Sequence, residues 1–198
     1  MTDWAEVYRA NIAAVADLAE GLSTEELSRN VPATPDWTVH DVLAHLAGGP
    51  ADVLNGRMDG APGPDWTERH VAERAARTTP EIVSEMRAHV GEVVAGLDGN
   101  DRPALVWNAA VHHADLREAL GKGVPPAAMW RPVVEAMEPS LGEHAAALAG
   151  VPDYERFRML FSRRSRAQTA GWNTGLDQAT LDGFAIFGAR DDDQPVPR

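Results

Sequence analysis

The sequence contains no cysteine in 198 residues. This absence excludes disulfide bonds, zinc sites built from thiolates and a catalytic thiolate supplied by the protein itself. Thiol chemistry carried out by this protein would therefore need a thiol from a separate small molecule.

The chain is also poor in positive charge and in long apolar runs. Its net charge of −12 would repel a phosphate backbone, which argues against nucleic acid as a partner. No apolar run approaches the roughly 20 residues that span a bilayer, and the N-terminus lacks the basic and apolar regions of a signal peptide. We therefore expect a cytoplasmic protein that acts on a small molecule and has no membrane partner.

Apolar residues recur at helical spacing through most of the chain, which predicts a mainly α-helical protein. We expect residues 1–150 to form a four-helix bundle, with a short helix that begins at Ser23 and a weak surface helix at 66–77. A further helix after residue 125 should be bent or split by Pro139. The four principal antiparallel helices are expected at 4–22, 38–54, 79–97 and 103–121.

Residues 151–198 have a different texture, and we expect them to form a short C-terminal α(+β) extension packed on the bundle. Apolar residues alternate with arginines at 154–162, which favours a short strand, although a helix is also compatible with that length. A last helix is expected at 176–187. The segment 190–198, RDDDQPVPR, is expected to be a solvated, flexible tail.

The second principal helix follows the segment PDWTVHDVLAHLAGG, residues 35–49. Thr38 and Asp41 form a capping box, in which each side chain satisfies a free backbone N–H of the first turn. The glycine pair and Pro50 should stop the helix or kink it. His45 lies on the apolar face of this helix, where an imidazole needs a hydrogen bond or a metal, because an unpaired buried polar group costs about 1–3 kcal/mol.

The fourth principal helix carries VWNAAVHHADLREALG, residues 106–121. Asn108 and His112 stand one turn apart, so both side chains can bind one ion. Metal sites in helix bundles are built from single side chains on facing helices, which points to His45, Asn108 and His112 as ligands. Such a set leaves coordination positions open for water or substrate. Asp115 is either a further ligand or an acceptor that fixes an imidazole tautomer.

Structural roles compete with these assignments. A single histidine on a helix face is more often a hydrogen-bonded core residue than a ligand. His113 directly follows His112, about 100° further around the helix, so we expect it to be exposed. The histidines with charged neighbours are expected to be solvated, and the tryptophans to anchor core and loops; the solvated set is His40, His70, His89 and His144.

One cluster of arginines interrupts the acidic chain. It offers Arg163, Arg164 and Arg166 as candidates for holding an anionic substrate. The favoured alternative is that these arginines pair with the chain's own carboxylates. The whole cluster comprises Arg156, Arg158, Arg163, Arg164 and Arg166.

Together the segments 35–49 and 106–121 resemble the DinB-like, mycothiol-dependent maleylpyruvate isomerase family of actinobacteria. The resemblance covers about the first 125 residues, and the order and spacing of both motifs agree. It implies a four-helix bundle with a divalent metal in its core, usually zinc, and a low-molecular-weight thiol such as mycothiol. In a purified sample nickel is the alternative metal. The implied metal ligands of this chain are His45 and His112.

The chain departs from the family pattern at Asn108, which stands where the family has a glutamate. An amide is neutral and a weaker ligand than a carboxylate, so the metal affinity should be lower. The extension is also shorter than the family's second domain, and none of the five clustered arginines can be matched to the family's catalytic arginine.

The sequence thus favours a metal-binding, thiol-dependent transferase or isomerase that acts on a small electrophile, as a monomer or homodimer. In this hypothesis His45 and His112 bind the metal, Asn108 completes or lines the site, Asp115 orients a ligand, and Trp37 packs beneath the site. The alternative is a catalytically degenerate bundle that binds a small ligand or a protein. A metal-dependent hydrolase is a third possibility, for which the sequence offers no general base.

Overall fold

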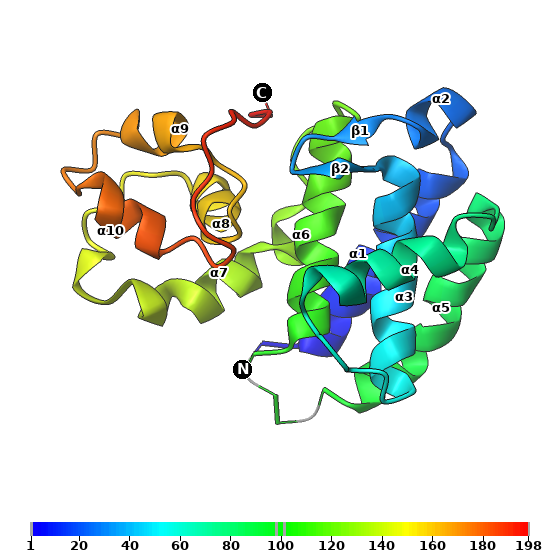
Figure 1. Cartoon of the computed structure of the whole chain (residues 1–198). Helices are drawn as coiled ribbons and strands as arrows, with labels where there is room; N and C mark the ends of the chain where they lie inside the picture. The colour runs from blue at the N-terminus through cyan, green and yellow to red at the C-terminus, as the bar shows by residue number, and fades with distance from the viewer. Residues whose placement is uncertain (1, 98, 101, 198) are drawn as a thin grey trace.

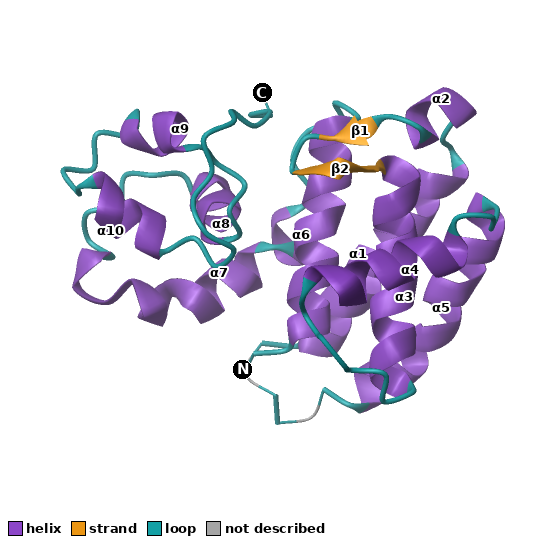
Figure 2. Ribbon diagram, viewed as in Figure 1, coloured by secondary structure: helices purple, strands orange, loops and turns teal. Residues whose placement is uncertain are grey.

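The computed structural model describes residues 2–97, 99–100 and 102–197, so Met1, Asp98, Asp101 and Arg198 lie outside the described residues. The fold is mainly α-helical, as predicted (Figure 2). The elements in chain order are α1 (Trp4–Glu20), α2 (Thr24–Leu27), β1 (Asn30–Val31), β2 (Thr34–Thr38), α3 (Val39–Leu54), α4 (Pro64–Arg74), α5 (Thr79–Ala95), α6 (Ala104–Ala119), the 3₁₀ helix η1 (Ala127–Met129), α7 (Arg131–Met137), the 3₁₀ helix η2 (Glu138–His144), α8 (Asp153–Leu160), α9 (Arg166–Ala170) and α10 (Gln178–Gly183).

Four long helices form the bundle. Helices α1 and α3 each pack against both α5 and α6, which closes a ring of four (Figure 1). Each contributes residues with almost no exposed surface, among them Val15, Val42, Ile82 and Val106. Strands β1 and β2 pair antiparallel and lead into α3, with Thr38 at the junction. The predicted bundle is therefore confirmed.

The helix ends follow the predicted capping chemistry with small differences. The capping boxes at Ser23 and Thr38 are both present. The cap of α5 is Thr78 and not the residue after it, and its partner is Glu81. Helix α3 runs unbroken to Leu54 with Pro50 inside it, so the glycine pair does not end the helix. Pro139 marks the expected break, where α7 gives way to η2.

Helix α4 lies against α3 because Gly48 has no side chain. A Cβ atom at Gly48 would stand 2.5 Å from the Cβ of His70 and 2.8 Å from a guanidinium nitrogen of Arg74. The expected weak surface helix at 66–77 is in fact a helix with one buried face, on which Trp66, His70 and Arg74 follow one another at four-residue spacing.

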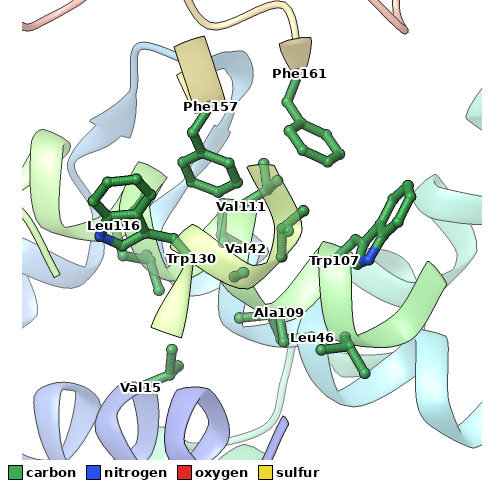
Figure 3. Packing of buried hydrophobic residues seen from close by; sticks show 14 of the residues in the cluster. Val15, Val42, Leu46, Trp107, Ala109, Val111, Leu116, Trp130, Phe157 and Phe161 are labelled. Atoms are coloured by element: carbon green, nitrogen blue, oxygen red, sulfur yellow. The ribbon is translucent and has the colours of Figure 1, made fainter. Parts of the chain in front are cut away.

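Helices α7 to α10 form a second group of elements beside α6 (Figure 1). The core is continuous between the two groups: Phe161 meets the ring of Trp107 edge-on, with 6.3 Å between ring centroids (Figure 3). Of the two alternatives for 154–162, the helix is correct and the strand is wrong, because Asp153–Leu160 is helix α8. In a half-buried strand the apolar residues are buried and the arginines between them are exposed. Here Arg158 and its neighbour Phe157 are both buried, so the alternation in sequence is not an alternation in burial.

The C-terminal segment is packed further than expected. Arg190 donates hydrogen bonds to the carbonyls of Pro32 and Ala33, in the turn between β1 and β2. Gln194 is buried, and Ser165 donates to Asp193. Asp191, Asp192 and Asp193 are exposed, as expected of a solvated segment, whereas hydrogen bonds hold Arg190 and Gln194 on the protein. The last predicted helix is also shorter than expected, Gln178–Gly183 in place of 176–187.

None of the described helices is both long enough and apolar enough to cross a bilayer.

Candidate functional site

The bundle brings together the three side chains predicted as metal ligands. His45 projects from α3 and His112 from α6, and their rings meet edge to face with 5.0 Å between centroids. The amide of Asn108 lies against His45, with its Nδ2 3.1 Å and its Oδ1 3.3 Å from Nε2. Both imidazoles are buried, whereas Asn108 is only half-buried. The cluster therefore reaches solvent on the side of Asn108.

His70 is part of this cluster, which the sequence did not indicate. Its Nδ1 lies 3.1 Å from Nδ1 of His45, and its Nε2 lies 3.0 Å from Oδ2 of Asp52. The prediction of a solvated His70 is wrong, because the buried face of α4 carries it onto α3. The charged residues beside it in sequence point to other sides of the helix.

Asp52 is the buried carboxylate behind His70. Arg69 donates to its Oδ2 at 2.6 Å, and Arg57 lies 3.2 Å from its Oδ1. Burial works to raise the pKa of Asp52, but the hydrogen bonds from Arg69 and His70 and the charge of Arg57 outweigh it and hold the pKa below its usual range. Asp52 is thus an ionised acceptor.

Asp115 occupies the corresponding place behind His112. Its Oδ2 lies 3.0 Å from Nδ1 of His112, within hydrogen-bonding distance but without the angle of a hydrogen bond. Arg158 and Arg163 both pair with this carboxylate. Burial opposes ionisation of Asp115, but the two guanidinium charges hold its pKa well below the usual range. Asp115 therefore faces the back of His112.

The imidazoles of the cluster are neutral. Burial is the main cause that lowers the pKa of His45, His70 and His112, and at His45 the nearby imidazoles add to it. Neutral imidazole is the form that binds metals and accepts hydrogen bonds.

Two tryptophans form apolar walls around these rings. Trp37, at the end of β2, lies 5.0 Å from the His45 ring and 6.2 Å from the His112 ring, measured between centroids. Trp66 of α4 meets His70 edge-on at 4.2 Å. Trp37 is only partly buried, so its ring and the amide of Asn108 form the outer edge of the cluster.

His113 is buried and not exposed as expected. Its Nδ1 lies 2.9 Å from Oδ1 of Asn11 on α1, and burial lowers its pKa to about 4. We expected one of two adjacent histidines to be exposed because their side chains point about 100° apart. This expectation is wrong because α6 is covered on nearly all sides, by the bundle and by the C-terminal helices. The other histidines expected in solvent, His40, His89 and His144, are each partly buried.

All five clustered arginines pair with carboxylates of the same chain, as the favoured alternative expected. Arg158 and Arg164 are buried and share Glu118, to which Tyr154 also donates at 3.0 Å. Arg166 is exposed and pairs with carboxylates on and after α10. The two remaining members are Arg156, which pairs with Asp153 and Glu138, and Arg163, which pairs with Asp115.

The donor set fits a weakly held divalent ion. Within the described residues, no three His, Cys, Asp or Glu side chains come together as a metal cluster. The available ligands are one nitrogen each from His45 and His112 and, after a turn of its side chain, the amide oxygen of Asn108. Imidazole ligands suit zinc and nickel, but an amide oxygen is a weak ligand for them, and a neutral set leaves the ion's charge uncompensated. The negative charges nearest the site are those of Asp52 and Asp115, which lie beside His70 and His112 and are not themselves among the available ligands.

Comparisons with known proteins agree with this architecture. Residues 8–137 match the family model described as the mycothiol maleylpyruvate isomerase N-terminal domain. Neither the curated proteins nor the solved structures gave a significant match. The matched region runs from α1 to the end of α7, and it includes His45, Asn108 and His112. The chain therefore belongs to the mycothiol maleylpyruvate isomerase N-terminal domain family.

Proposed function

We propose that this protein is a metal-dependent transferase or isomerase that acts on a small electrophilic substrate. It would use an external thiol, such as mycothiol. The observation that supports this proposal is the pair of buried, neutral imidazoles, His45 and His112, which meet beside Asn108 at the edge of the bundle. The absence of cysteine means that the chain itself supplies no thiolate. Membership of the family makes an isomerase-related activity the natural expectation.

The chain's residues have separate roles in this proposal. His45 and His112 would hold a divalent ion, zinc or nickel, and Asn108 would add its amide oxygen. When bound, the ion supplies a Lewis acid that favours the thiolate form of a thiol at neutral pH. Asp115 orients His112, and Trp37 offers an apolar face to the substrate while it keeps water from the rings.

Metal content tests the proposal directly. The untagged protein is dialysed to equilibrium against zinc, and elemental mass spectrometry measures the excess of zinc on the protein side over the buffer side. We expect about one zinc per chain, lost in His45→Ala and retained in the control His40→Ala, since the imidazole of His40 bonds to the Arg77 carbonyl and not to the cluster. A zinc content near zero in the wild-type protein would overturn the metal-dependent function.

Asn108→Glu sharpens the test, because a carboxylate is a stronger ligand than an amide. We expect this variant to bind zinc much more tightly than the wild-type protein, as measured by competition with a chelating dye. Unchanged affinity in Asn108→Glu would mean that the three side chains do not share one ion.

A second candidate function is a catalytically degenerate bundle that binds a small ligand or a protein. It is favoured by the amide of Asn108, which already satisfies Nε2 of His45 at 3.1 Å. In that case the cluster needs no ion. Absence of zinc, together with neither consumption of mycothiol nor mycothiol-dependent conversion of electrophiles such as maleylpyruvate, would favour this second function.

A further inference from the structure

A chain of hydrogen bonds fixes which nitrogen of His45 carries its proton. The chain runs from Asp52 to His70, from His70 to His45 and from His45 to Asn108, with separations of 3.0, 3.1 and 3.1 Å. Each neutral imidazole has one donor nitrogen and one acceptor nitrogen, so the direction of the first bond determines all the others.

The first bond has only one possible direction. Asp52 is ionised and can only accept, so Nε2 of His70 carries the proton. Nδ1 of His70 is then an acceptor and must receive its hydrogen from Nδ1 of His45. This leaves Nε2 of His45 with a free lone pair, to which Asn108 presents its NH₂ group, the closer of its two amide atoms.

We propose that His70 and Asp52 are positioning residues that hold the proton of His45 on Nδ1 and direct its Nε2 lone pair toward Asn108 and His112. The two residues act through His45, and neither touches the place where a substrate would bind. The arrangement has the form of the supporting carboxylate and hydrogen bond that orient a histidine ligand. Only its expected effect on metal affinity rests on the proposed function.

The packing around His70 favours a dedicated role over a chance contact. His70 has no exposed side-chain surface. Its approach to α3 depends on Gly48, where any Cβ would strike the imidazole. Asp52 lies on the same helix as His45, seven residues later, and so on the same face. Two arginines keep Asp52 ionised even though it is buried.

Nitrogen-15 NMR of the metal-free protein tests the proposal. Long-range proton–nitrogen correlations of an imidazole distinguish the protonated from the bare ring nitrogen. In the wild-type protein we expect His45 to be protonated on Nδ1 and bare on Nε2. Protonation of His45 on Nε2 would overturn the proposal, whether or not the protein binds zinc.

Two variants at position 70 separate positioning from packing. His70→Phe keeps a ring of similar size against Trp66 but removes the acceptor, so the His45 proton should no longer be confined to Nδ1. His70→Asn places an amide oxygen near the former Nδ1 and should restore the wild-type signal. An unchanged His45 tautomer in His70→Phe would refute the positioning role.

Zinc affinity provides a second measurement that links the inference to the proposed function. If the wild-type protein binds zinc, we expect His70→Phe to weaken binding about 10- to 100-fold, with His70→Asn closer to wild type. The matched control His40→Phe should leave both affinity and tautomer unchanged. A wild-type protein that binds no zinc but shows the predicted tautomer would refute the proposed function and still support the inference.

Discussion

The two adjacent glycines of α3 should respond in opposite ways to the same substitution. Gly48 and Gly49 are both buried within one helix, but their surroundings differ. A methyl group at Gly48 would stand 2.5 Å from the Cβ of His70 and 2.6 Å from its Cγ. At Gly49 the nearest atom, on Trp66, is 3.8 Å away, which is an ordinary van der Waals contact.

The magnitudes follow from these distances. Alanine favours a helix interior over glycine by about 1 kcal/mol, so Gly49→Ala should be neutral or raise the free energy of unfolding by up to that amount. Gly48→Ala has the same gain, but the forced displacement of α4 costs about 1–3 kcal/mol. That displacement also separates His70 from His45, and an unpaired buried N–H costs a further 1–3 kcal/mol or so.

We therefore expect Gly48→Ala to lower the free energy of unfolding by about 1–5 kcal/mol, and Gly49→Ala to leave it unchanged or higher. Urea denaturation followed by tryptophan fluorescence and by circular dichroism measures both variants against the wild-type protein. Equal stability of the two variants, or a more stable Gly48→Ala, would show that α4 does not depend on the missing side chain at Gly48.

Two further predictions concern His113 on α6 and the buried Arg158 of α8, which pairs with carboxylates of α6. The folded-state pKa of His113, about 4, lies below its ordinary value of 6.5, so its contribution to stability is complete above pH 6.5 and is lost as pH falls toward 4. Between these limits the wild-type protein should lose about 3 kcal/mol more than His113→Asn in urea denaturation, and parallel pH profiles would contradict this. Arg158→Met should cost about 3–5 kcal/mol because it leaves Asp115 and Glu118 short of one buried positive charge, whereas Arg166→Met, at an exposed pair, should change the denaturation midpoint little. Similar losses in the two arginine variants would contradict the distinction.

The local features of the fold could be predicted from the sequence because they depend on neighbours along the chain. The capping boxes at Ser23 and Thr38 and the break at Pro139 are of this kind. The helical periodicity also placed His45 and His112 on faces that turn to the bundle interior. No longer-range information was needed for these features.

The missed parts depend on contacts between segments. His70 looked solvated because its sequence neighbours are charged, but on a helix the residues four apart share a face, and Trp66 and Arg74 are those residues here. That spacing was the available signal. Its counterpart on α3 is the seven-residue spacing from His45 to Asp52. The crossing of α4 over Gly48, which joins the two faces, has no signature in either helix taken alone.

The burial of His113 and the helix at 153–160 have a common cause. Helix α6 is covered by the bundle on one side and by the C-terminal group on the other, so it has no face for an exposed histidine. Arg158 is buried because Asp115 and Glu118 of α6 neutralise it, and this defeats the alternation of apolar and charged residues that suggested a strand. A charged residue usually indicates an exposed position, but a residue that pairs with charges from another segment can be buried.

The same pairing makes the C-terminal group part of the candidate site. Two imidazoles of the cluster, His70 and His112, each have a carboxylate behind them, but the two carboxylates are held by different parts of the chain. Asp52 is held by Arg57 and Arg69, within the region that matches the family, whereas Asp115 is held by Arg158 and Arg163, beyond residue 137. Without those two arginines, Asp115 would be a buried and unpaired charge behind His112, a condition that costs about 3–5 kcal/mol where a buried pair is broken. The short C-terminal group therefore supplies the positive charges that keep Asp115 ionised behind His112.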